Sequence, residues 1–224
     1  MSQQTISIVI PTLNEEENLP KVLDLLRQDS SNIKEIIIVD GYSKDKTVEV
    51  AKQNKVDKII FDDKGKGSSL IKGMEAAEGD IVIVMDADLS HQTNEIRIMA
   101  AGIEAGFDVV MGSRFIQGGG TSDMTVLRYL GNKFFVLVVN FVWGMQYSDL
   151  CYGYRAIRRD AIPKLGLDSD GFDIETEISI KAAKAKLRVL EIPSFEKLRE
   201  SGVGKLNTFR DGWAILKRII GELF

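Results

Sequence analysis

Two carboxylates follow one of the apolar runs of this sequence with the spacing of a metal site. Asp86 and Asp88 stand directly after Ile81–Met85, with one residue between them. Alternate residues at the end of a strand can turn both carboxylates toward one cation, and Mg²⁺ or Mn²⁺ takes such oxygen ligands together with substrate phosphates. The same pattern also occurs at ordinary polar strand ends. A site for these metals is favoured because the single cysteine, Cys151, and the single histidine, His91, exclude zinc held by Cys and His.

Other carboxylates also follow apolar runs. Asp40 follows the run that ends at Val39, and Asp62 and Asp63 follow the run that ends at Phe61. In open α/β sheets, ligands bind at the carboxyl ends of the strands. The sequence therefore predicts one binding site that gathers these carboxylates at one edge of a sheet.

The elements that would position these residues alternate in the first half of the chain. Short Ile- and Val-rich runs alternate with amphipathic segments, which is typical of βαβ units and a parallel sheet covered on both faces. The strands that we expect are Ile6–Ile10, Glu35–Val39, Lys58–Phe61, Asp80–Met85 and Asp108–Met111. The helices that we expect between them are Glu15–Arg27, Lys44–Asn54, Ser68–Ala77 and Thr93–Glu104.

The second half has a different pattern. We expect a long apolar helix near Val126–Trp143, a helix near Glu175–Lys186, a short strand at Arg188–Ile192 and a final amphipathic helix from about Thr208. Between Glu196 and Leu206 the chain is basic and carries little signal of order. No linker is long enough to separate two domains, so residues 1–224 predict one domain, with halves of about 1–115 and 116–224.

Composition and missing motifs exclude several classes of protein. The net charge is −4, which argues against a nucleic-acid binder that works through bulk positive charge. No G-x-G-x-x-G follows the first strand and no P-loop motif occurs, so hydride transfer and P-loop chemistry lose their main support. The N-terminus lacks the pattern of a signal peptide, and the longest apolar stretch, Phe134–Trp143, is about half the ~20 residues of a membrane span. We therefore expect a cytoplasmic protein.

Five motifs, in this order and spacing, resemble those of family 2 glycosyltransferases: VIPTLNEEENL, IVDGYSKDKT, GKGSSLIKG, VMDADLSH and GSRF. This resemblance implies the GT-A fold, a Rossmann-like three-layer α/β sandwich with a mostly parallel central sheet. The second half resembles the dolichol-phosphate mannose synthase and polyprenyl-phosphate glycosyltransferase branch. That likeness rests on Arg128 with Gly131-Asn132, on Ser148-Asp149-Leu150 before Gly153-Tyr154-Arg155, and on the segments Gly171–Glu177 and Arg199–Lys205. Together they cover about residues 5 to 210.

The resemblance assigns a donor site for a nucleotide diphosphate sugar. It places around the base, ribose and diphosphate the residues Pro11, Thr12, Asn14, Glu15, Asp40, Lys66, Asp86 and Arg114. Asp86 and Asp88 would hold Mg²⁺ or Mn²⁺ against the diphosphate, and Ser90 stands where this branch commonly has a Gln. From the residues alone, Asn14 and Glu15 could instead cap a helix, Asp40 could belong to a turn, and Lys66 to a solvated loop.

Further residues are assigned to catalysis and to the acceptor. Asp88 and Arg114 are catalytic candidates, and Arg114 suits phosphate because its planar fork binds two oxygens. The acceptor phosphate is assigned to Arg128, Arg199 and Lys205. His91 matches a histidine of the family, and we interpret it as a polar loop residue.

An acidic cluster stands where related enzymes place a catalytic carboxylate. Glu175 and Glu177 are the catalytic candidates, and Asp173 shares a helix face with Glu177 through i, i+4 spacing. A hydroxyl acceptor needs a general base, whereas a phosphate acceptor is already ionised and needs none. The sequence leaves open which carboxylate matters.

The expected function is metal-dependent, inverting transfer of a hexose from a nucleotide diphosphate sugar to a polyprenyl phosphate. Transfer to a soluble hydroxyl acceptor and a non-catalytic nucleotide-sugar-binding module are the alternatives. The donor sugar and base are not readable. The stripe predicted to meet a membrane surface is Phe209, Trp213, Leu216, Ile220 and Leu223, with Arg210, Lys217 and Arg218 nearby. The protein would then be peripheral on the cytoplasmic face; packing of the stripe on the sheet or on another copy, as a homo-oligomer, is the alternative.

Overall fold

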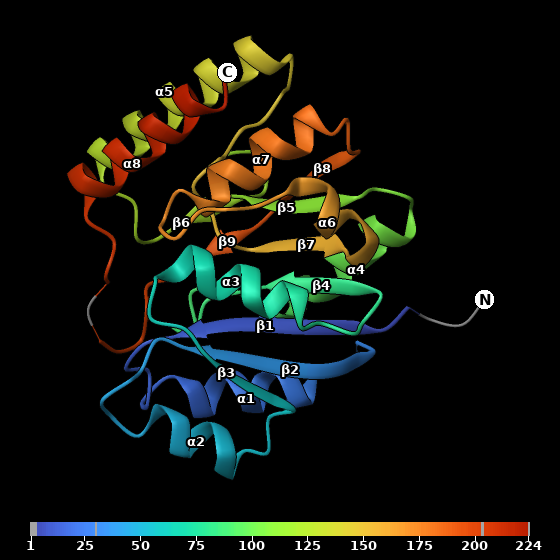
Figure 1. Ribbon diagram of the computed structural model, residues 1–224, viewed down its shortest axis with the longest axis vertical. Coiled ribbons are helices and arrows are strands. Elements are labelled where there is room, and N and C mark those ends of the chain that lie inside the picture. Colours follow the sequence, from blue (N-terminus) through green and yellow to red (C-terminus); the bar gives the residue numbers. More distant parts are fainter. Residues whose placement is uncertain (1–3, 30, 203, 224) are drawn as a thin grey trace.

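A seven-stranded sheet forms the centre of the molecule in the computed structural model, which describes residues 4–29, 31–202 and 204–223 (Figure 1). The strand order is β3-β2-β1-β4-β7-β5-β8. The bounds are β1 Ile6–Thr12, β2 Ile33–Asp40, β3 Lys58–Phe61, β4 Ile81–Val84, β5 Val109–Ser113, β7 Arg155–Arg158 and β8 Val189–Pro193. Only β7 runs antiparallel to its neighbours, β4 and β5. The expected mostly parallel sheet is confirmed, and strands from both halves of the chain share it.

Helices cover both faces of the sheet. On one face lie α1 (Leu19–Gln28), α2 (Thr47–Gln53) and α4 (Ile96–Glu104), and on the other α3 (Lys66–Glu75) and α7 (Ile174–Lys184). The long helices α5 (Val126–Trp143) and α8 (Thr208–Gly221) lie side by side beyond α7 (Figure 1). Side chains alternate across a strand, so Val9 joins the core under α3 and α7 while Ile8 and Ile10 join the core over α1 and α4. The three-layer α/β architecture is therefore confirmed.

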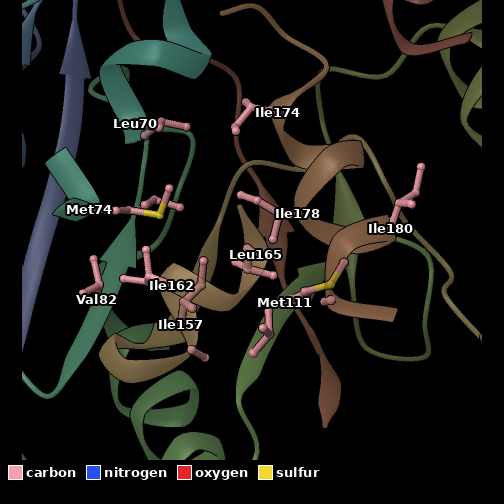
Figure 2. Packing of buried hydrophobic residues seen from close by; sticks show 14 of the residues in the cluster. Leu70, Met74, Val82, Met111, Ile157, Ile162, Leu165, Ile174, Ile178 and Ile180 are labelled. Atoms are coloured by element: carbon pink, nitrogen blue, oxygen red, sulfur yellow. The ribbon is translucent and has the colours of Figure 1, made fainter. Parts of the chain in front are cut away.

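The core under α3 and α7 fixes the two helices relative to each other (Figure 2). Leu70 and Met74 of α3 and Ile178 of α7 belong to one buried cluster with Val82 and Met111 of the sheet. Interiors of this kind are close-packed, so helix positions are held to a fraction of a side chain. As a result, the first turns of α3 and α7 are held together at one edge of the sheet.

The structure departs from the sequence-based prediction in several short elements. The prediction had no strand at β7, in which Arg155 is fully buried. Its guanidinium donates to the carbonyls of Leu150 and Tyr152 and to the hydroxyl of Ser179, which satisfies the charge inside the sheet. The other unpredicted elements are β6 (Gly120–Thr121), β9 (Phe195–Glu196), α6 (Ile162–Leu165) and the 3₁₀ turns η1 (Thr93–Glu95) and η2 (Arg159–Ala161).

The helix α5 corrects the estimate made from Phe134–Trp143 alone. Its 18 residues are long and apolar enough to cross a membrane, by length and composition, and only 17% of this window is buried. The buried side of the helix carries Asn132, Val136 and Val139, so most of its apolar surface faces outward.

Candidate active site

Two adjoining cavities open at the carboxyl ends of the strands. The first has a volume of about 200 Å³ and reaches across the ends of β3, β2, β1 and β4. The second, of about 300 Å³, lies against α5 and α8. The residues that line both cavities are Lys66, Asp86, Asp88, Phe172, Arg199 and Lys205. The predicted metal carboxylates therefore stand at the junction of the two cavities.

Lys66, Asp86 and Glu175 form a charged cluster at this junction. The Nζ atom of Lys66 lies 2.9 Å from Oδ1 of Asp86 and 3.0 Å from Oε1 of Glu175. Burial acts to lower the pKa of Lys66, but the charges of Asp86 and Glu175 raise it well above its ordinary value. Burial acts to raise the pKa of Asp86, and the nearby charges, Lys66 first, bring it below its ordinary value. Lys66 and Asp86 are therefore both charged at neutral pH.

The two glycines that flank Lys66 explain how the lysine enters the site. The backbone of residues 169–171 lies directly against the loop, and the amide of Gly67 donates to the carbonyl of Asp170 at 3.0 Å. A Cβ atom at Gly65 would lie 2.3 Å from the Asp170 oxygen, and one at Gly67 would lie 2.4 Å from the Ser169 oxygen. Glycine is therefore required on both sides of Lys66, which rules out an ordinary solvated loop.

Asp88 is balanced by a second cation. Nη2 of Arg199 lies 2.7 Å from Oδ2 of Asp88, and the carbonyl of Asp88 accepts from the amide of Glu200 at 3.4 Å. The amide of Lys197 donates to the carbonyl of Ser90. The basic segment that begins after β9 therefore lies across the junction of the cavities; Val203, within this segment, is outside the described residues.

The donor set at Asp86 and Asp88 fits a hard divalent cation. Both groups supply carboxylate oxygens, and the described part of the chain contains no cluster of three or more His, Cys, Asp or Glu that could form a complete protein cage. Mg²⁺ is usually bound by one or two carboxylates together with substrate phosphates and water. Asp86 and Asp88 would hold such an ion, with the remaining positions taken by phosphate oxygens and water. Ser90 donates its amide to Oδ1 of Asp88, which orients that carboxylate.

His91 lies in the loop after β4, as expected, but its side chain is buried. Its Nδ1 atom accepts from the amide of Asp86 at 3.0 Å, and its ring stacks on Tyr154 at 4.7 Å between centroids. The Nε2 atom lies 4.0 Å from Oδ2 of Asp86. His91 therefore orients both the backbone and the carboxylate of Asp86. In the sequence, the feature that points to this role is the position of His91 three residues after Asp88.

The donor residues of the first loop divide into two groups. Pro11, Thr12 and Glu15 line the first cavity, and Oε1 of Glu15 lies 3.6 Å from Nζ of Lys205. Asp40 is fully buried and accepts from the hydroxyl of Thr12 and from the amide and hydroxyl of Ser43. Its oxygens are engaged in the turn, and Asp40 is not among the residues that line either cavity. Asn14 likewise lies outside the lining residues, and its Oδ1 accepts from the amide of Lys44.

The fork of Arg114 is occupied by protein carboxylates. Its Nε and Nη2 atoms contact Asp149 at 2.7 and 2.9 Å, and its Nη1 contacts Glu196 at 3.1 Å. Arg128 is different: its Nε donates to the hydroxyl of Thr208 at 3.3 Å, and no carboxylate pairs with it in the described chain. Both arginines line the second cavity. Of the two, Arg128 is the one whose positive charge no described carboxylate balances.

The three acidic residues near α7 have separate partners. Only Glu175 lines a cavity; Glu177 is buried and accepts from the amides of Asp168 and Ser169. Asp173 pairs with Nε of Arg218 at 2.9 Å, and Glu177 lies 3.3 Å from Nη1 of the same arginine. The shared partner agrees with the predicted common face of Asp173 and Glu177. These two carboxylates therefore tie α8 and the preceding loop to α7.

The architecture and the strand-end site define an α/β protein of the GT-A type. The chain belongs to glycosyl transferase family 2, whose family model matches residues 7–166. It is 30% identical over 219 residues to the polyprenol monophosphomannose synthase of Mycolicibacterium smegmatis, covering 92% of this chain and 82% of that protein. It is 33% identical over 209 residues to the dolichol-phosphate mannosyltransferase of Pyrococcus furiosus, covering 90% of this chain. The chain spans 59% of the length of that archaeal relative.

The solved structures support the fold. The crystal structure of glucosyl-3-phosphoglycerate synthase from Mycobacterium tuberculosis with phosphoglyceric acid superposes with a TM-score of 0.78 at 18% identity, covering 98% of this chain and 80% of that one. The same enzyme in complex with Mn²⁺, uridine diphosphate and glucosyl-3-phosphoglycerate gives a TM-score of 0.72 at 18% identity, with 98% and 78% coverage. The predicted three-layer GT-A sandwich is thus confirmed.

Proposed function

We propose that this chain transfers a hexose from a nucleotide diphosphate sugar to a polyprenyl phosphate, with a divalent metal and with inversion at the sugar carbon. The first cavity would bind the donor along the ends of β1 to β4. The polyprenyl phosphate would enter the second cavity and meet the donor at Asp86, Asp88 and Lys66. The names of the two relatives, a dolichol-phosphate mannosyltransferase and a polyprenol monophosphomannose synthase, support this acceptor class.

The observation that carries the proposal is the composition of the second cavity. Its walls include Leu127 and Phe135 of α5 and Phe209 and Ile215 of α8, and its lining also carries cations, among them Arg128, beside several carboxylates. A cavity with apolar walls and an arginine that no described carboxylate pairs with suits a molecule with an apolar chain and an anionic head. A small polar hydroxyl acceptor would leave these apolar walls exposed to water.

A phosphate acceptor removes the need for a general base. The phosphate oxygen is already ionised at neutral pH, and Arg128 has a guanidinium with no carboxylate partner in the described chain to receive it. Glu175 forms an ion pair with Lys66, and its role in this proposal is to position that lysine. Burial raises the pKa of the Cys151 thiol in the same cavity to about 12, so the thiol is uncharged and serves no nucleophilic role.

The departure of the nucleoside diphosphate is supported by the positive charges at the junction. Lys66 and Arg199 line both cavities and would face the diphosphate oxygens. A divalent cation bound by Asp86 and Asp88 supplies further positive charge against the negative charge that develops on the leaving group. With the donor in one cavity and the acceptor in the other, attack and departure lie on opposite sides of the sugar carbon, which inverts its configuration.

The proposed acceptor lives in a bilayer, and the second cavity opens beside an exposed apolar surface. We define this surface as the α5–α8 face: Val126, Leu130, Phe134, Leu137 and Phe141 of α5 with Phe209, Trp213 and Ile220 of α8. The side chains of Phe141 and Phe209 are 88% and 79% exposed. The stripe predicted on the terminal helix thus does not pack on the sheet. Arg218, predicted to face lipid, is engaged by Asp168 and Asp173.

The experiment that tests the proposal measures release of nucleoside diphosphate from a panel of nucleotide sugars. We expect release that requires Mg²⁺ or Mn²⁺, is abolished by excess EDTA, and rises strongly when a polyprenyl phosphate is added. Asp88→Ala should lose turnover by more than 100-fold because a metal ligand is removed, while the chain stays folded. Full activity in EDTA would contradict the metal assignment, and release that does not depend on any polyprenyl phosphate would contradict the acceptor.

A further inference from the structure

Arg155 is a buried cation to which the proposed reaction assigns no role. It lies on β7, between β4 and β5, and its side chain is fully buried. Its guanidinium donates to three oxygens, none of them a carboxylate oxygen, and it forms no ion pair among the described residues. A buried charge is costly unless it is paired and hydrogen-bonded, and an arginine stays protonated in a protein. The three acceptors therefore decide what this charge can do.

Two of the acceptors flank one short segment of the second cavity. Nη2 of Arg155 donates to the carbonyl of Leu150 at 3.1 Å, and Nε donates to the carbonyl of Tyr152 at 3.3 Å. Residues 151–153 line the second cavity and do not line the first. Because both donors belong to one rigid guanidinium, the two carbonyls are held at a fixed separation. Arg155 thus fixes the backbone on both sides of Cys151.

The third acceptor connects this segment to α7. Nη1 of Arg155 donates to the hydroxyl of Ser179 at 2.9 Å, and that hydroxyl donates to the carbonyl of Glu175 at 2.9 Å. Burial acts to lower the pKa of Arg155, and the charge of Glu175 is the first of the charges that oppose this effect. Arg155 therefore joins the 151–153 segment to the turn of α7 that carries Glu175.

The same segment lies directly against the charged cluster at the junction of the cavities. A Cβ atom at Gly153 would lie 3.2 Å from both Oε1 of Glu175 and Nζ of Lys66. It would also lie 3.7 Å from Oδ2 of Asp86. The backbone at Gly153 thus borders the cluster on the side of the second cavity, and its position depends on the hydrogen bonds of Arg155 to the neighbouring carbonyls.

We propose that Arg155 is a positioning residue for the acceptor half of the site, because it holds the 151–153 segment in place against α7 and the charged cluster. Arg155 lines neither cavity, so it acts only through the residues that it holds. The link to the acceptor rests on the proposed function, since it assumes that the second cavity binds the polyprenyl phosphate. Donor binding should depend less on Arg155, because the ion pair of Lys66 with Asp86 does not involve the segment.

The first test uses Cys151, the single cysteine of the chain, and needs no substrate. Burial raises the pKa of its thiol to about 12, so alkylation by iodoacetamide should be slow in the folded wild type. Arg155→Met removes all three donors and frees the backbone on both sides of Cys151. We expect alkylation at least about 10-fold faster than in wild type, well below the unfolding temperature.

Two further variants make this test specific. Arg155→Lys keeps the charge and a donor, so we expect a rate between those of wild type and Arg155→Met; it also tests the inference if the methionine variant does not fold. Arg158→Met is the matched control, because Arg158 lies on the same strand and pairs with Asp108 and Asp160 instead. Its Cys151 should react as slowly as that of wild type.

The second test separates the acceptor from the donor. In the folded Arg155 variants we expect the KM for polyprenyl phosphate to rise, by about 10-fold in Arg155→Met and by less in Arg155→Lys. The affinity for GDP or UDP with Mg²⁺, whichever nucleotide wild type binds, should change less than about threefold in titration calorimetry. A merely structural role would lower the melting temperature without this difference between acceptor and donor.

The outcomes distinguish this inference from the proposed function. Wild-type reactivity of Cys151 in the folded Arg155 variants, or equally fast alkylation in Arg158→Met, would overturn the positioning role. Faster alkylation with an unchanged KM for polyprenyl phosphate would overturn the link to the acceptor. Absence of transfer to polyprenyl phosphate by wild type would overturn the proposed function and that link with it, whereas the alkylation rates decide independently whether Arg155 holds the segment.

Discussion

Each carboxylate assigned to the metal is balanced by a cation of the protein. Asp86 pairs with Lys66 and Asp88 with Arg199, and burial makes such charges costly unless they are paired. An incoming divalent cation would therefore share these carboxylates with Lys66 and Arg199 at the junction of both cavities. Lys66 and Arg199 would then be available to bind the donor diphosphate and the acceptor phosphate.

The role of Glu175 separates a phosphate acceptor from a hydroxyl acceptor. Glu175→Gln keeps the shape of the side chain and removes the charge that pairs with Lys66. If Glu175 positions Lys66, turnover should fall by about 10-fold, whereas loss of a general base costs roughly 100- to 10,000-fold. The measurement is kcat with a saturating polyprenyl phosphate across pH 6 to 9. A loss beyond 100-fold, with a changed pH profile, would assign Glu175 as a base.

Arg128 is expected to bind the acceptor more than the donor. Arg128→Ala removes a guanidinium that has only the hydroxyl of Thr208 as a described side-chain partner, so the fold should persist. We expect the KM for polyprenyl phosphate to rise by about 10-fold or more, because a charge-assisted contact is lost, with the KM for the donor within twofold. Lys133→Ala, on the same helix but outside the cavity lining, is the control. Equal increases in both KM values would place Arg128 in the scaffold.

At this scale the sequence predicts residue types better than their partners. Asp86 and Asp88 are recognisable because they directly follow a buried strand. The engagement of Arg114 was not predictable, since Asp149 is 35 residues away in sequence and Glu196 is 82. In the same way, only tertiary structure shows that Glu175 faces the junction while Glu177 holds the 168–169 backbone.

At the scale of elements, the site depends on the contact between the loop before α3 and the loop before α7. The strands β1 to β5 and the major helices were predictable from hydrophobic periodicity. The strand β7 was not, because Arg155 finds backbone and hydroxyl partners inside the protein. The close approach of residues 169–171 to Gly67 joins two segments about 100 residues apart, and no local pattern reports it.

Gly67→Ala tests this contact. The added Cβ atom would lie 2.4 Å from the Ser169 oxygen and 2.9 Å from the Gly171 oxygen, so the two loops must separate. We expect a loss of about 1–3 kcal/mol in the free energy of unfolding and a drop in donor affinity as Lys66 moves. Gly221→Ala, at the end of α8 with open space around it, should change neither quantity by much. Wild-type stability and donor affinity in Gly67→Ala would contradict the role of the loop contact. Denaturant unfolding and calorimetric titration supply the two measurements.

At the scale of the whole molecule, the exposed α5–α8 face and the lining of the second cavity share Phe209. Exposed apolar side chains gathered on neighbouring helices mark an interaction site on a protein. We assign it to the bilayer that contains the proposed acceptor, because the cavity for that acceptor opens between the same two helices.

Co-sedimentation with liposomes tests this assignment. We expect binding that survives high salt, because Arg218 and Arg210 pair with carboxylates and the contact is mainly apolar. Phe141→Ser with Phe209→Ser should reduce the bound fraction several-fold while donor affinity remains. Ile98→Ser, which changes a 52% exposed apolar residue on α4, is the control and should bind as wild type. Loss of the bound fraction in the control alone, or no binding by wild type, would contradict a role of the α5–α8 face in membrane contact.

The central claim is that the two cavities pass a sugar from a nucleotide to a lipid phosphate. The direct measurement incubates the protein with radiolabelled nucleotide hexoses, including GDP-mannose, in the presence of a polyprenyl phosphate and of 3-phosphoglycerate in parallel. The labelled product is then partitioned between organic solvent and water. The account predicts metal-dependent label in the organic phase as a polyprenyl phosphate hexose that is lost in Asp88→Ala. Label transferred only to the water-soluble acceptor would contradict it.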